Sequence, residues 1–282
     1  MEWPKLKNII ILILLVVNGF LLVLVGARKE ESARYERLAL EQTMQALENG
    51  GIQVDPDAVD SAEGLTPMAA ERDLGRELQL AKALLGKGTV QVENQGGGLY
   101  LYQNGSGELS VRAGGELSAE MADDPNLLAD GGPERHAAGL LKRMGIDAEQ
   151  IDVTEESEWT RVRFRQVWNG VPVFSCEVEF VYDDTRLSSV QGTLLTAQAG
   201  TAEAGSCLTL PTALMRFSEG IASAGDVCTA IRSMEAGYRG TVQSLSGGVR
   251  LAPVWLVTTD TAKYYLDCAT GSLTRVADQS RT

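Results

Sequence analysis

The sequence is poor in the residues that most enzyme mechanisms use. His136 is the only histidine among 282 residues. A single histidine excludes most metal sites and any mechanism that needs histidines in more than one role. The chain also has no HExxH, GxSxG, SxxK or Walker motif. We therefore predict a protein that is not an enzyme, with no catalytic residue, no cofactor and no metal site.

Basic residues are also scarce. The chain has 25 Lys and Arg against 38 Asp and Glu, which gives a formal net charge of −13. Such a surface repels phosphates, so nucleic acid is excluded as a partner. It also repels anionic lipid headgroups, so any attachment to membrane lipid has to be hydrophobic. No motif identifies a small-molecule substrate.

Four cysteines are present, and they leave the disulfide question open. Outside the cytoplasm they could pair in three connectivities. Cys176 lies between Phe174 and Val178 on the apolar face of a predicted strand, which favours a core thiol. Cys207 and Cys228 flank a predicted helix, whose length would hold them far apart. The cysteine spacings match no zinc pattern.

One long uncharged run stands near the amino terminus, at 8–26. As a helix its nineteen residues would span about 28 Å, close to the thickness of the bilayer hydrocarbon. We predict a cytoplasmic tail over 1–7, an uncleaved transmembrane signal anchor over 8–26, and an extracytoplasmic remainder. The predicted location is the cell membrane, with a single pass. A cleaved signal peptide ending near Val25-Gly26-Ala27 and a buried core helix are the alternatives.

Small and polar residues recur within this run at helical spacing. Helices in lipid associate through small residues and interhelical hydrogen bonds, because lipid supplies no hydrophobic drive for pairing. We predict a transmembrane interaction stripe made of Leu15, Asn18, Gly19, Leu22 and Gly26.

In the rest of the chain, the sequence predicts the same order three times: one helix followed by antiparallel strands. No βαβ alternation occurs, so the predicted class is α+β: an N-terminal transmembrane helix, then extracytoplasmic helix-plus-antiparallel-sheet modules. The predicted segments are a stalk helix over 27–50, a first module over 51–113, a linker over 114–132, a second module over 133–196 and a third over 197–282.

The clearest strands flank Asn169-Gly170, a strong signal for a hairpin turn. Apolar and charged residues alternate on both sides of it, so one face of the hairpin packs inward and the other is wet. We interpret the arginines on the wet face as balanced by glutamates across the hairpin, and we prefer this to an anion site. The residues are Arg161, Arg163 and Arg165 on one strand and Glu177 and Glu179 on the other.

Four stretches carry a resemblance to a known family. They are Met1-Glu2-Trp3 with Lys5 and Lys7; 71–74 (ERDL) leading to 84–86 (LLG); 164–174 (FRQVWNGVPVF); and 253–255 (PVW) with 264–271 (YYLDCATG). Together they resemble YycI-type proteins of Gram-positive bacteria. The last two also resemble PepSY-type and metallopeptidase-propeptide modules, in which a helix packs on an antiparallel sheet.

The resemblance implies regulation. YycI-type proteins work with a related protein, YycH, and restrain the sensor histidine kinase of the YycFG (WalKR) cell-wall system. We therefore expect a membrane-anchored extracytoplasmic regulator of a sensor histidine kinase in two-component signalling. Its expected partners are the kinase, a YycH-like protein and membrane lipid, reached through protein–protein and transmembrane helix contacts. The alternative is a PepSY-like secreted or anchored protease inhibitor or propeptide-like binding protein. The family supplies no catalytic residues.

Overall fold

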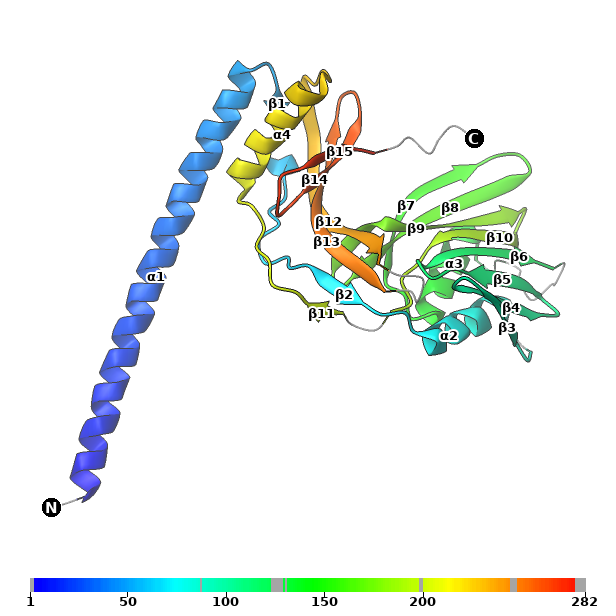
Figure 1. The fold of residues 1–282 in the computed structure, drawn as a ribbon, viewed down its shortest axis with the longest axis horizontal. Helices are drawn as coiled ribbons and strands as arrows, with labels where there is room; N and C mark the ends of the chain where they lie inside the picture. The colour runs from blue at the N-terminus through cyan, green and yellow to red at the C-terminus, as the bar shows by residue number, and fades with distance from the viewer. Residues whose placement is uncertain are drawn as a thin grey trace.

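The computed structural model describes residues 3–86, 88–122, 129, 131–197, 200–243 and 248–276. One long helix projects from a sheet-rich α+β body (Figure 1). The helices are α1 (Trp3–Asn49), the short 3-10 helix η1 (Pro56–Ala58), α2 (Leu74–Leu85), α3 (Pro133–Arg143) and α4 (Leu210–Ala224). The strands are β1 (Gln53–Val54), β2 (Met68–Ala70), β3 (Gln91–Gly96), β4 (Leu99–Asn104), β5 (Gly107–Val111), β6 (Glu116–Met121), β7 (Ala148–Glu155), β8 (Trp159–Trp168), β9 (Val171–Asp183), β10 (Arg186–Thr193), β11 (Thr201–Ala202), β12 (Ala230–Val242), β13 (Val249–Thr259), β14 (Lys263–Asp267) and β15 (Leu273–Arg275).

The prediction of a membrane-spanning helix over 8–26 is wrong. Within the described part of the chain, no helix combines the length and the apolar character that crossing a membrane requires. Residues 8–26 instead form the first part of α1, which continues through 27–50, the predicted stalk. The two segments are one element because no proline falls between Pro4 and Pro56 to interrupt it. Apolar and charged residues therefore share a single helix of mixed polarity.

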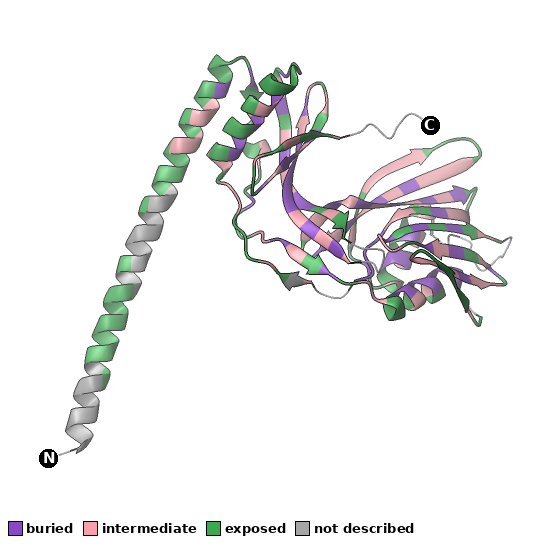
Figure 2. Ribbon diagram, viewed as in Figure 1, coloured by how far each residue is buried: buried purple, intermediate pink, exposed green. Residues whose placement is uncertain are grey.

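Where the side chains of α1 are described, it packs on the body at its carboxyl end. Leu47 is buried, and α1 contacts α4 there. Figure 2 shows buried residues along the strands of the body, whereas the described side chains in the first half of α1 are exposed. The helix ends at Asn49, and Gly51 takes a φ of +86°, a conformation that favours glycine.

The strands form one long mixed sheet. Its order is β11-β2-β13-β12-β9-β10-β6-β5-β4-β3, with β7 and β8 extending from β9 and with β14 and β15 extending from β13. Most neighbours are antiparallel, but β12 is parallel to β9, with Tyr238 opposite Val173, and β1 is parallel to β12. The expectation of purely antiparallel sheets is thus corrected. Strand β9 pairs with β8 along its whole length, and its other edge is long enough to pair with β10 at the carboxyl end and with β12 at the amino end.

Helices α2 and α3 cover one face of the strands from β3 to β10. The buried core there includes Leu84, Leu140, Val162 and Phe180. We call this part the first unit. The apolar spacing over 69–85 predicts a helix that starts at residue 69, whereas α2 begins at Leu74 because the Asp73 side chain caps it. The residues before it form β2 instead.

The segment 114–132, predicted to be a linker, contains strand β6. This strand pairs with β5 on one side and β10 on the other. Leu117 and Ala119 alternate with exposed residues and face the core. The segments predicted as a first and a second module consequently share one sheet and one core.

The predicted hairpin at Asn169-Gly170 is confirmed. Both turn residues have positive φ, +51° and +81°, as a type I′ turn requires. The turn joins β8 to β9, with Phe164 opposite Val178 and Val162 opposite Phe180.

A second unit is built from α4, the end of α1 and the strands β12 to β15. Its core contains Phe217, Trp255 and Tyr264, all fully buried. The Trp255 Nε1–H donates to the carbonyl oxygen of Asp60 at 2.9 Å. The β9–β12 pairing joins this second unit to the first.

Candidate functional site

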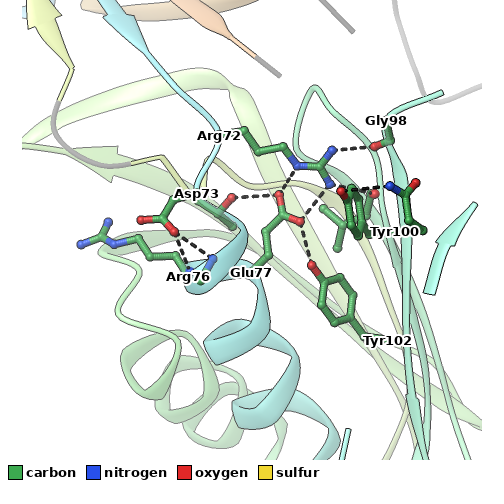
Figure 3. Close-up of polar contacts among 11 residues, drawn as sticks. Arg72, Asp73, Arg76, Glu77, Gly98, Tyr100 and Tyr102 are labelled. Atoms are coloured by element: carbon green, nitrogen blue, oxygen red, sulfur yellow. Dashed lines mark hydrogen bonds and ion pairs between the residues drawn. The ribbon is translucent and has the colours of Figure 1, made fainter. Parts of the chain in front are cut away.

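A buried ion pair lies at the start of α2 (Figure 3). Glu77 is 1% exposed, and the Arg72 side chain is 6% exposed. The guanidinium binds the carboxylate in a bidentate manner: Nε donates to Oε1 at 2.5 Å and Nη2 donates to Oε2 at 2.8 Å. The Tyr102 hydroxyl also donates to Oε2 at 3.0 Å, and the Thr196 hydroxyl donates to Oε1 at 3.4 Å.

Arg72 also binds the strands beside α2. Its Nη1 donates to the carbonyl of Gly98 at 2.6 Å and its Nη2 donates to that of Val111 at 3.2 Å. The guanidinium carbon lies 4.9 Å from the centre of the Tyr100 ring. Burial and the neighbouring carboxylate of Glu77 raise the pKa of Tyr102. Because protein groups occupy both carboxylate oxygens, we assign this cluster to holding α2 on the sheet rather than to chemistry on a substrate.

Arg72 belongs to the 71–74 stretch that carries the family resemblance, whereas sequence reasoning missed Glu77. A signal was present, since Glu77 shares helical spacing with the buried Leu80, Ala81 and Leu84. A carboxylate on the apolar face of a helix indicates a buried partner.

His136 packs against a buried tyrosine of the core. Its Nδ1 lies 3.0 Å from the hydroxyl oxygen of Tyr182, and the two rings meet edge to face. Tyr182 is fully buried, and burial raises its pKa. His136 is half-buried, and alternation along β9 carries its partner Tyr182 to the side covered by α3.

A charged surface lies on the side of β8 and β9 away from α2 and α3. The apolar residues of these strands face the core, so the pleat directs the intervening charged residues outward. The predicted balance of arginines by glutamates across the hairpin is confirmed for Arg161 and Arg165, whereas Arg163 pairs with an aspartate on β7. The ion pairs of this face are Arg161–Glu179 at 3.0 Å, Arg163–Asp152 at 3.3 Å and Arg165–Glu177 at 3.2 Å.

Arg165 links the two units. Its side chain is 13% exposed and reaches Glu149 on β7 at 3.5 Å and Glu235 on β12 at 3.6 Å, in addition to Glu177. The guanidinium also lies over the ring of Phe174, 5.2 Å from its centre. Burial raises the pKa of Glu235, and the nearby positive charge of Arg165 opposes that rise.

Aromatic residues continue this surface onto the second unit. The rings of Phe174 and Tyr265 lie 6.2 Å apart, and the guanidinium of Arg239 lies 5.0 Å from the centre of Tyr265. Phe174 is itself buried, and with Val254 and Leu256 it forms a small apolar cluster beneath Tyr265, on the side of the sheet opposite α4. We call the whole surface the outer sheet face; it consists of Arg161, Arg163, Arg165, Glu177, Glu179, Glu235, Arg239 and Tyr265.

A hollow of about 320 Å³ borders the outer sheet face at the β8–β9 turn. Its lining includes Asp60, Glu63, Gly170, Pro172 and Glu235. Within the described residues, no group of three or more histidine, cysteine or acidic side chains is placed to hold a metal ion.

The predicted stripe on α1 is only partly described. Leu15, Asn18 and Gly19 are exposed, and a side chain added at Gly19 would meet no atom within 4 Å. Leu22 and Gly26 belong to α1, but their exposure is not among what the structure describes. Because no described helix is long and apolar enough to span a membrane, the stripe is not placed in a transmembrane helix. A role of the stripe in helix pairing stays a prediction.

Comparisons with known proteins add little to this geometry. No protein-family model matches the chain, and no curated protein matches it. Among solved structures, the chain is similar to the Bacillus megaterium YpeB C-terminal domain, with 12% identity and a TM-score of 0.37. The similarity covers 74% of this chain and 100% of that one. None of these comparisons supports the YycI-type resemblance.

Proposed function

We propose that this chain is a protein-binding module without turnover, and that it binds through the outer sheet face. One observation carries the proposal. In each unit the helices cover one side of the sheet, and the two sides without helices adjoin where Arg165 of the first unit reaches Glu235 of the second. The surface that results combines arginines with the half-buried Tyr265, and arginine and tyrosine are both enriched at the centres of protein interfaces.

We further propose an extracytoplasmic peptidase as the partner, which makes the chain an inhibitor or propeptide-like binding protein. The two stretches that resemble PepSY-type and metallopeptidase-propeptide modules lie in β8–β9 and in β13–β14. These segments are far apart in the sequence, yet Phe174 of one contacts Tyr265 of the other just beneath the outer sheet face. The extracytoplasmic location and the absence of turnover are part of this proposal. Kinase regulation stays a prediction, because no feature of the described structure favours it.

An inhibition assay tests this proposal. The full chain is titrated against a thermolysin-type metallopeptidase that is cleaving a fluorogenic peptide. We expect inhibition that saturates near one chain per enzyme while the chain itself stays intact on a gel. The chain is also incubated alone with peptide, glycan and ester substrates, where we expect no product. Digestion of the chain without inhibition, or turnover that a single substitution abolishes, would overturn the proposal.

A further inference from the structure

Cys207 and Cys268 are brought together by two segments that run side by side. Cys207 lies just before α4, and Cys268 directly follows β14. The Leu208 N–H donates to the carbonyl of Cys268 at 2.7 Å, and the Cys268 N–H donates to the carbonyl of Pro253 at 3.0 Å. The backbone of Cys268 is therefore held from both sides, next to the backbone that carries Cys207.

The two side chains also lie in the same packed region. The Cys207 thiol donates to the carbonyl of Leu65 at 3.3 Å, and Cys207 packs against the core cluster in which Cys268 is fully buried. A disulfide needs Cα atoms about 4.4 to 6.8 Å apart, a separation that is usual for residues on backbones that share a hydrogen bond. The sequence left three connectivities open, and this proximity selects among them.

The other two cysteines lie elsewhere. Cys176 is packed in the cluster around Trp168 and Tyr238. The Cys228 thiol donates to the carbonyl of Ala230 at 3.5 Å, at the start of β12. All four are free thiols in the structure.

We propose that Cys207 and Cys268 form a reversible disulfide that fastens the segment entering α4 to the end of β14. The bond would close a loop of about 60 residues that contains α4, β12, β13 and β14. Because Cys268 and the strands of this loop belong to the core of the second unit, oxidation would stabilise that unit without rearranging it.

The oxidant is a disulfide of the glutathione class. The Cys207 thiolate attacks one sulfur of glutathione disulfide, and one glutathione thiolate leaves. The Cys268 thiolate then attacks the Cys207 sulfur and releases the second glutathione. Two protein thiols are oxidised to one disulfide, glutathione disulfide is reduced to two thiols, and the two protons pass to the leaving thiolates. Cys207 attacks first because it is half-buried, whereas Cys268 is fully buried.

Burial raises the pKa of both thiols. Since the thiolate is the reacting form, exchange should be slow near neutral pH and should accelerate as the pH rises toward 9.

Peptide mapping of the full chain tests the pairing, because lysine and arginine positions put each cysteine in a different tryptic peptide. Cys207 falls in 187–216 and Cys268 in 264–275. The chain is equilibrated with glutathione disulfide and glutathione at pH 8, alkylated, and digested without reduction. We expect 187–216 joined to 264–275, with Cys176 and Cys228 alkylated. Four alkylated cysteines, a different pair, or only mixed disulfides with glutathione would overturn the proposal.

Melting temperatures give a second readout. Closing a loop of this size should raise the melting temperature of the oxidised chain by about 5 to 15 °C over the reduced chain. Cys207→Ser should abolish both the joined peptides and the shift, whereas the matched control Cys228→Ser should keep both. A shift that persists in Cys207→Ser would contradict the pairing.

Discussion

At the scale of single residues, Glu77 and Arg72 show how this protein accommodates a buried charge. Three hydroxyl or guanidinium groups satisfy the carboxylate, and two backbone carbonyls satisfy the rest of the guanidinium. A buried pair of this kind adds little net stability over an apolar pair of similar volume. Removing one partner alone is costly, because the other charge is then buried without compensation.

We therefore expect Glu77→Gln to lower the free energy of unfolding by about 3 to 5 kcal/mol. The matched control is Glu116→Gln, because Glu116 and its partner Arg112 are 67% and 65% exposed and their charged atoms lie 3.8 Å apart. An exposed pair contributes about 0 to 1 kcal/mol. Urea unfolding of both variants measures the difference, and equal losses would show that the Arg72–Glu77 pair is not buried as described.

Glu235 should give stability a pH dependence. Burial raises its pKa in the folded state, so the folded protein binds this proton more tightly than the unfolded chain does. The stability that follows is complete below the ordinary pKa of 4.5 and is lost as the pH rises through the raised value. Measured in urea from pH 4 to pH 8, the wild type should lose stability relative to Glu235→Gln. A gap that stays constant, or that changes in the opposite direction, would contradict this environment.

At the scale of elements, the β8–β9 hairpin has a sharply two-sided character. Phe180 is fully buried beneath α3, while Glu179 on the next position pairs with Arg161 on the outer sheet face. The pleat alone produces this contrast, because successive side chains of a strand point to opposite faces.

Phe180→Ala should lower the free energy of unfolding by about 3 to 5 kcal/mol, since it leaves a cavity in the core. Glu179→Ala, its neighbour on the same strand, should cost under about 1 kcal/mol. Urea unfolding of the two variants distinguishes them. Similar losses would mean that the register of the hairpin is wrong.

Sequence reasoning works for this hairpin because its signals are local. Alternation and the Asn169-Gly170 turn act within about twenty residues, and neither depends on distant contacts. Strand β2 was missed because it pairs with β11 and β13, which lie far along the chain. Without those distant contacts, the amphipathic pattern before Leu74 predicts a longer helix. In the structure the Asp73 side chain caps α2, which therefore begins at Leu74.

At the scale of the whole molecule, the outer sheet face depends on one parallel contact. The β9–β12 pairing places Phe174 against Gly237, where any added side chain would clash with the phenylalanine ring. That contact aligns the exposed sides of the two units and brings Arg165 to Glu235. The sequence contains the charges of this face, but it does not show that strands almost a hundred residues apart share it.

The central claim is that the outer sheet face binds a partner, and the inhibition constant of surface variants tests it most directly. The variant is Arg163→Ala combined with Arg239→Ala, which removes two exposed arginines from the face. The control is Arg112→Ala, an exposed arginine in the β5–β6 turn that is not part of the face.

We predict that the double variant inhibits the thermolysin-type peptidase about 30-fold more weakly than the wild type, as expected for a loss of about 2 kcal/mol at an interface. Arg112→Ala should stay within about 2-fold of the wild type, as expected for a residue outside the contact. Equal inhibition by all three proteins, or a loss of the same size in the control, would contradict the assignment of the outer sheet face as the binding surface.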